Sequence, residues 1–270
     1  MNTIKNFSSI ENDPIKNITI ESTTIKNTSI KTSTIETSTI KTSTIENTAA
    51  GTALSNIDRQ QLAKALLLYA VTDNTRPGSH TPEHQVKAAL DGGITMLQLR
   101  EKYLDEQEFA AEARAIKKLT SQYGIPLIIN DNLNVALQCD ADGLHIGQDD
   151  VPVAVARAAL GRDKILGVSA HTVGLAIAAE AAGADYIGTG AMFATATKDD
   201  AAAVSIDTLA EICRSVSIPV VAIGGVSVSN MASLFTTGIA GVAIVSAIFA
   251  QPDITRAART LYTAACQYHG

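Results

Sequence analysis

Eight short apolar runs alternate with Ala-rich helical patterns from about residue 56 to the end of the chain. The runs are apolar throughout rather than alternating, which indicates strands buried on both faces, as in parallel sheets. Helical periodicity separates them, most clearly at 107–122, 173–182 and 206–214. The expected strands are 67–72, 95–100, 126–130, 143–146, 165–169, 185–188, 220–224 and 241–246.

Eight such units in about 210 residues predict an α/β fold, a (β/α)8 or TIM barrel near the small end of the usual length range. A doubly wound open sheet is the alternative. That fold would favour a Gly-x-Gly-x-x-Gly turn after the first strand, whereas this strand ends in Thr72-Asp73-Asn74. The barrel is therefore the preferred prediction.

The N-terminal segment has a different composition. Thr, Ile, Ser and Asn make up 35 of the first 50 residues, and Ile recurs every fifth position from Ile20 to Ile45. A step of five turns each Ile by about 140° on a helix and alternates faces on a strand, so no apolar face forms. We predict a disordered low-complexity tail over residues 1–55 and a barrel domain over 56–270. An organelle transit peptide is the alternative, but the first 50 residues contain no Arg and five acidic residues.

Charge and composition disfavour several functional classes. The net charge of −6 and the pI of about 5.4 argue against a nucleic-acid partner. No apolar run approaches the length of a membrane span, and no basic start precedes an apolar block. Cys139, Cys213 and Cys266 are scattered, which fits neither a disulfide framework nor a zinc cluster. We expect a cytoplasmic protein without a membrane partner.

Basic and amide side chains follow the second expected strand. Gln98, Arg100 and Lys102 are spaced by two, so an extended chain points all three the same way. In a barrel, the carboxyl ends of the strands form the face where ligands bind. These residues therefore predict an anion site. The alternative is a solvated strand end with ion pairs to Glu101 and Asp105.

Carboxylates follow the next two strands. Asp131 ends the third strand, and Asp150 lies in the loop after the fourth. Adjacent strands lie about 4.8 Å apart, so the two carboxylates can share a cation, and oxygen ligands favour Mg²⁺. Helix capping by Asp131 and Asp150 is equally consistent with the spacing. His145, within the fourth strand, is predicted to be a hydrogen-bonded core residue.

Small and polar residues follow the last three strands. Thr195, Thr197 and Lys198 could hold an oxyanion, and the loops beginning at 224–225 and 245–246 match the usual phosphate position of barrels. Tight strand-to-helix turns are the alternative. With the basic and acidic residues above, these features suit an enzyme that joins a diphosphate ester to a phosphorylated partner.

In this order, the motifs resemble the thiamine phosphate synthase (thiamine-phosphate pyrophosphorylase) family over roughly residues 64–268. The most specific pair combines the second-strand motif with the motif that contains the fourth strand. The matching motifs are Tyr69-Ala70-Val71-Thr72-Asp73, Gln98-Leu99-Arg100-Glu101-Lys102, Ile129-Asn130-Asp131, the segment 142–150, Gly167-Val168-Ser169, Thr195-Ala196-Thr197-Lys198, Ile223-Gly224-Gly225-Val226 and Val245-Ser246-Ala247-Ile248.

The resemblance implies that a hydroxymethylpyrimidine diphosphate and a hydroxyethylthiazole phosphate are joined to thiamine phosphate with release of pyrophosphate. It implies that Asp131 and Asp150 bind Mg²⁺ as the cofactor. The pyrimidine diphosphate site would comprise Gln98, Leu99, Arg100, Glu101, Lys102, Asn130, Ser169 and Lys198, of which Arg100, Lys102, Ser169 and Lys198 would be catalytic. The thiazole phosphate site would comprise Thr195, Ala196, Thr197, Gly225, Val245 and Ser246. The family usually has Pro where this chain has Ala191.

Three other functions share the scaffold. A thiazole tautomerase would not need the diphosphate-binding set, and a phosphosugar isomerase or epimerase would need only one phosphate site. A non-catalytic protein that binds thiamine precursors would release no pyrophosphate. The sequence leaves the oligomeric state open, although barrels often form homo-oligomers through their outer helices.

Overall fold

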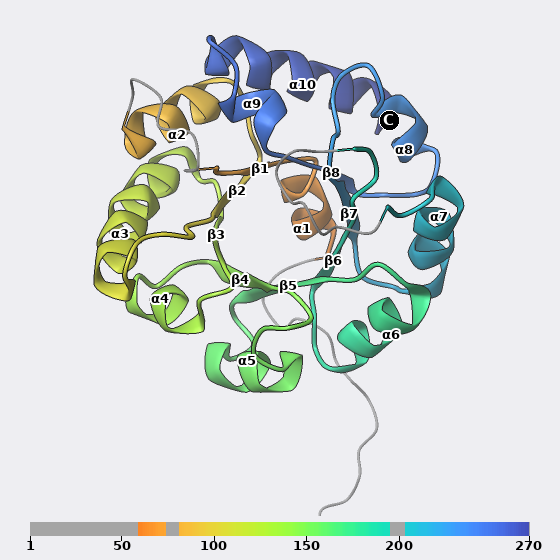
Figure 1. Cartoon of the computed structure of the whole chain (residues 1–270), viewed down its shortest axis with the longest axis horizontal. Helices are drawn as coiled ribbons and strands as arrows, with labels where there is room; N and C mark the ends of the chain where they lie inside the picture. The colour runs from red at the N-terminus through yellow and green to blue at the C-terminus, as the bar shows by residue number, and fades with distance from the viewer. Residues whose placement is uncertain (1–58, 74–80, 195–202, 270) are drawn as a thin grey trace, which may run out of the picture. The chain divides into compact units, whose positions relative to one another are not determined.

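The computed structural model describes residues 59–73, 81–194 and 203–269. Eight parallel strands follow one another around a closed barrel, and β8 pairs with β1 to complete it (Figure 1). The predicted (β/α)8 fold is thus confirmed, and every expected strand is found within two residues at either end. The strands are β1 (Leu68–Val71), β2 (Met96–Leu99), β3 (Leu127–Asn130), β4 (Gly143–Ile146), β5 (Ile165–Ser169), β6 (Tyr186–Thr189), β7 (Val220–Ile223) and β8 (Gly241–Ile244).

Helices surround the barrel, except that α1 lies inside the ring when the molecule is viewed as in Figure 1. Leu62 lies in α1, and Leu66 follows the helix directly. Both side chains pack with residues that face the barrel axis, so this helix closes one end of the barrel. No described helix is long and apolar enough to cross a membrane. The helices are α1 (Arg59–Ala65), α2 (Pro82–Asp91), α3 (Glu106–Tyr123), α4 (Leu133–Gln138), α5 (Val153–Leu160), α6 (Val173–Ala181), α7 (Ile206–Ser215), α8 (Ala232–Phe235), α9 (Ser246–Phe249) and α10 (Ile254–Tyr268). The predicted tail, residues 1–55, lies outside the described residues.

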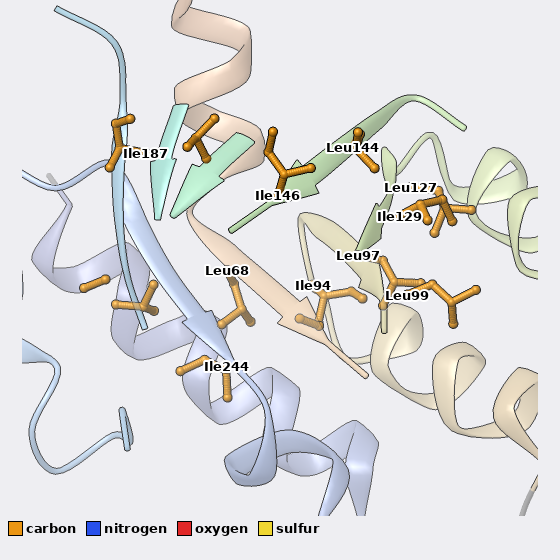
Figure 2. Close-up of a cluster of buried hydrophobic side chains, with 14 of the residues drawn as sticks. Leu68, Ile94, Leu97, Leu99, Leu127, Ile129, Leu144, Ile146, Ile187 and Ile244 are labelled. Carbon is orange, nitrogen blue, oxygen red and sulfur yellow. The ribbon is translucent and has the colours of Figure 1, made fainter. Parts of the chain in front are cut away.

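The strands separate two apolar layers. Strand residues such as Leu97, Ile129 and Leu144 pack outward against the helices (Figure 2). Their neighbours along each strand, such as Met96 and Ile128, point inward and pack with α1. Because both faces of each strand are buried, the strands read as continuous apolar runs in the sequence.

Two carboxylates, from the buried Asp185 and the partly exposed Asp142, connect the amino ends of neighbouring strands. Asp185, just before β6, accepts hydrogen bonds from the backbone N–H of Leu166 at 2.8 Å and from Nη2 of Arg157 at 2.5 Å. Asp142, just before β4, accepts from the backbone N–H of Leu127 at 2.7 Å and pairs with Lys117. These contacts join neighbouring strands at the end of the barrel away from the strand carboxyl ends.

Glycine at two inward positions leaves room for aromatic side chains. A Cβ on Gly167 would lie 2.1 Å from Cζ of Tyr186. A Cβ on Gly188 would lie 3.0 Å from Cε1 of His145. The barrel interior therefore accommodates a tyrosine and a histidine because the facing strand positions carry no side chain.

Replacing Gly167 with Ala should destabilise the barrel by about 1–3 kcal/mol, because the added methyl group overlaps the Tyr186 ring. The matched control is Gly174→Ala in α6, where a Cβ would meet no atom within 4 Å. This control should be neutral or slightly stabilising, since Ala favours a helix more than Gly does. Urea unfolding measures both, and a Gly167→Ala protein as stable as wild type would contradict the packing described.

Candidate active site

The anion-site residues that were predicted after the second strand lie at the carboxyl end of β2. Gln98 is almost fully buried and points into the barrel, where its Nε2 donates to the hydroxyl of Tyr69 at 2.7 Å. The backbone N–H of Arg100 donates to Oγ1 of Thr72 at 2.8 Å, which ties the ends of β1 and β2 together. Lys102 lies further out, at the rim. Leu99 packs in the outer apolar layer, so its side chain faces away from the barrel interior.

Glu101 differs from the basic residues on either side of it. Its Oε1 is buried and has no hydrogen-bond partner among the described residues. Burial raises the pKa of Glu101 to about 7, and repulsion from Glu112 adds to the rise while Arg100 opposes it. Glu101 therefore does not neutralise Lys102 by pairing with it, and the alternative of a self-paired strand end is not observed.

Lys102, Asp131 and Asp150 form a charged cluster across three neighbouring strand ends. Nζ of Lys102 lies 3.3 Å from Oδ2 of Asp131. The carboxyl of Asp150 interacts with that of Asp131 and accepts the backbone N–H of Gly147 at 2.6 Å. Desolvation raises the pKa of Asp150, and the negative charge of Asp131 adds to the rise. The structure thus brings together the two carboxylates and one of the predicted cations.

Neither carboxylate caps a helix. The N-cap of α4 is Asn132, whose side chain accepts the backbone N–H of Val135, and α5 begins after Pro152 without a side-chain cap. Asp131 instead has a left-handed backbone with φ of 61°, and its N–H donates to the carbonyl of His145 at 2.8 Å. Such a conformation is uncommon outside glycine and is frequent at functional sites. The capping alternative is therefore wrong for both residues.

The donor set fits a magnesium ion better than a structural metal. Within the described ranges, no group of three or more His, Cys, Asp and Glu side chains could hold a metal ion. Mg²⁺ typically needs only one or two carboxylates, because waters and substrate phosphates complete its octahedron. Such an open set of oxygen ligands is provided by Asp131 and Asp150, and the ammonium group of Lys102 lies beside Asp131.

Ser169 and Asn130 lie on the same side of the barrel. Ser169 ends β5, and its hydroxyl is 2.9 Å from Nε2 of His145. Nε2 of Gln148 donates to the Ser169 carbonyl at 2.6 Å, which joins the loop after β4 to the end of β5. Asn130 is the last residue of β3 and is half-buried. His145 is a hydrogen-bonded interior residue, as predicted.

The predicted thiazole phosphate residues are only partly described. Gly225 follows β7 with φ of 64°, and a Cβ there would lie 2.6 Å from the carbonyl oxygen of Ala194. Val245 and Ser246 follow β8 and start the short helix α9. Because β7 and β8 are paired, these residues lie at adjacent strand ends. Thr195, Ala196, Thr197 and Lys198 lie outside the described residues.

Two tyrosines in the barrel interior received no functional role from the sequence, although Tyr69 is part of the first matching motif. Tyr69 and Tyr186 lie at inward positions of β1 and β6 and are at most 1% exposed. Their hydroxyls are 2.8 Å apart, and Tyr186 also contacts Nδ1 of His145 at 2.9 Å. Their positions in apolar strands gave them the appearance of core residues. The available signal was that two buried hydroxyls need partners.

Known proteins resemble the chain over the barrel. A family model described as thiamine monophosphate synthase matches residues 68–248. The thiamine-phosphate synthase of Ruminiclostridium cellulolyticum is 52% identical over 194 residues, which cover 72% of this chain and 92% of that protein. The thiamine-phosphate synthase of Lacticaseibacillus paracasei is 48% identical over 201 residues, or 74% and 94% of the two chains.

Solved structures agree with this assignment. A thiamine phosphate pyrophosphorylase from Pyrococcus furiosus superposes with a TM-score of 0.71 at 33% identity, covering 77% of this chain and all of that one. A 3-hexulose-6-phosphate synthase has a TM-score of 0.57 at 16% identity, which shows a shared fold alone. The family match spans more than half of the chain, and the relatives are covered almost completely. The chain therefore belongs to the thiamine monophosphate synthase family.

Proposed function

We propose that the chain joins 4-amino-2-methyl-5-(diphosphooxymethyl)pyrimidine to hydroxyethylthiazole phosphate, which gives thiamine phosphate and pyrophosphate. The chain is a transferase of thiamine biosynthesis, as its family membership and its relatives indicate. The observation that carries the substrate assignment is the cluster of Lys102, Asp131 and Asp150. Two carboxylates with an adjacent cation suit a diphosphate that arrives with a divalent metal ion.

Magnesium fits this cluster. Asp131 and Asp150 would hold it, since both offer carboxylate oxygens at neighbouring strand ends and neither caps a helix. When bound, the ion would stabilise negative charge on the departing pyrophosphate. The strained backbone at Asp131 supports a functional role, because the turn directs its carboxylate toward Lys102 and Asp150.

The leaving group would be held by side chains from several strand ends. Arg100, Lys102 and Ser169, together with Lys198, would bind the diphosphate through charged and neutral hydrogen bonds. Breaking the C–O bond leaves positive charge on the pyrimidine methylene carbon and negative charge on pyrophosphate. Contacts that strengthen as this charge develops lower the barrier, because they stabilise the transition state more than the bound substrate.

The two rings would be held in contact with each other by side chains from different strand ends. Gln98 and Asn130 offer amide groups for the pyrimidine, while Leu99 and Glu101 would contribute through the backbone of the same segment. The thiazole phosphate would lie near Gly225, Val245 and Ser246 and the segment Thr195, Ala196 and Thr197. The thiazole nitrogen would then attack the methylene carbon, a step that needs no protein base.

The N-terminal segment would not take part in this reaction. The family match begins at residue 68, and α1, at Arg59–Ala65, closes one end of the barrel. We therefore assign activity to the barrel domain, residues 56–270, while residues 1–55 lie outside the described residues. The tail has acidic residues and no Arg, which supports a cytoplasmic enzyme rather than one imported into an organelle.

Replacing either Asp131 or Asp150 with Ala should lower kcat/KM for pyrophosphate release by about 100-fold. Each substitution removes one carboxylate ligand of the magnesium ion that would stabilise the leaving pyrophosphate. The matched control is Asp149→Ala, which removes an exposed carboxylate one residue away. Activity is measured as pyrophosphate released from both substrates, with and without Mg²⁺. Circular dichroism checks that each variant stays folded. Equal activity in the Asp149 and Asp150 variants would refute the assignment of the ligand.

Deleting residues 1–50 should leave the rate of pyrophosphate release and the thermal midpoint nearly unchanged. The physical reason is that the segment has no periodic apolar face to bury against the barrel. The full chain, assayed under the same conditions, is the control. A large loss of activity or stability would mean that the segment belongs to the folded domain.

A further inference from the structure

A continuous chain of side-chain hydrogen bonds runs through the barrel interior and joins two residues of the proposed substrate site. Gln98 contacts Tyr69 at 2.7 Å, and Tyr69 contacts Tyr186 at 2.8 Å. Tyr186 contacts Nδ1 of His145 at 2.9 Å, and Nε2 of the same ring contacts Ser169 at 2.9 Å. The five residues come from β2, β1, β6, β4 and β5, so the chain spans the barrel from one wall to another.

The first contact sets the direction of the whole chain. Nε2 of Gln98 can only donate, so the Tyr69 oxygen accepts from it, and we assign the Tyr69 proton to the contact with Tyr186. With that assignment Tyr186 donates to Nδ1 of His145. The ring is then assigned as the neutral form with its proton on Nε2, which donates to Ser169. The hydroxyl proton of Ser169 is left to point elsewhere.

The surroundings keep the two phenols in the protonated form that this chain needs. Tyr69 and Tyr186 are buried among apolar residues such as Met96, Ile128 and Val221. Burial raises the pKa of Tyr69 and of Tyr186 well above the usual value for tyrosine. Each hydroxyl therefore has one proton to donate at neutral pH, and an unpaired hydroxyl at this depth would be costly.

We propose that this chain is a directional positioning relay for the pyrimidine diphosphate, in which Tyr69, Tyr186 and His145 orient Gln98 and Ser169. The relay holds the Gln98 amide with its nitrogen on Tyr69, which leaves the amide oxygen to accept from the amino group of the pyrimidine. At the other end it leaves the Ser169 proton to be donated to a phosphate oxygen. The inference rests on the proposed function, and it adds three residues that touch neither reacting atom.

The state of His145 tests the direction without any substrate. In the full chain labelled with 15N-histidine, long-range proton–nitrogen spectra should show His145 as the neutral ring protonated at Nε2. The His145→Gln variant assigns the signal by its loss. In Tyr186→Phe, Nδ1 loses its donor, so the signal should shift toward a mixture of the two neutral forms. A wild-type ring protonated at Nδ1 would mean that the chain runs in reverse and would overturn the proposal.

Kinetics test the positioning role. Tyr186→Phe and Tyr69→Phe should each lower kcat/KM for the pyrimidine diphosphate by about 10- to 100-fold, with KM for the thiazole phosphate unchanged. Tyr69→Phe should also reduce discrimination against a 4-oxo analogue of the pyrimidine, because the Gln98 amide becomes free to turn. Tyr268→Phe, at the exposed end of α10, is the matched control and should behave as wild type.

The outcomes separate the relay from the proposed function. Wild-type protein that releases no pyrophosphate would refute the proposed function, while the His145 spectrum would still decide the direction of the chain. A folded Tyr186→Phe protein with unchanged kcat/KM and unchanged discrimination would overturn the relay and leave the proposed function standing. If one tyrosine variant fails to fold, the other variant and the wild-type spectrum provide the same decision.

Discussion

Closure of the barrel by the pairing of β8 with β1 is the constraint on which the rest of the structure depends. Parallel strands in a closed ring place all of their carboxyl ends at one rim. Residues that are far apart in the chain, such as Lys102, Asp131 and Asp150, meet there because the strands before them are neighbours. The charged cluster at this rim therefore follows from the closure and from the strand order.

Limited space inside the ring determines which side chains can share it. Gly167 and Gly188 leave room for Tyr186 and His145, so polar side chains replace part of the apolar filling expected in a small barrel. Buried hydroxyls in such a place need partners, and they find them in one another. The same packing that stabilises the barrel thus connects the ends of separate strands. Substitutions at neighbouring interior positions can therefore affect either the stability of the barrel or its function.

Without a bound ligand, the charges at the carboxyl-end rim of the barrel lower the stability of the folded protein. Asp131 and Asp150 repel each other, and the pair with Lys102 is half exposed and so offsets little of that repulsion. Asp131 also has a left-handed backbone. Unfavourable features of this kind are common at functional sites, where strain and like charges are concentrated.

The sequence by itself determined the strand order, the barrel and the family, because strands buried on both faces leave continuous apolar runs and because the motifs are specific. It also indicated that Gln98, Arg100, Lys102, Asp131 and Asp150 belong near one rim. Only the tertiary structure decided between capping and an open carboxylate pair, since both uses of Asp131 have the same spacing. Only the tertiary structure revealed the roles of Tyr69 and Tyr186 as linked hydroxyls, because the partner of a buried hydroxyl lies across the barrel and leaves no local pattern.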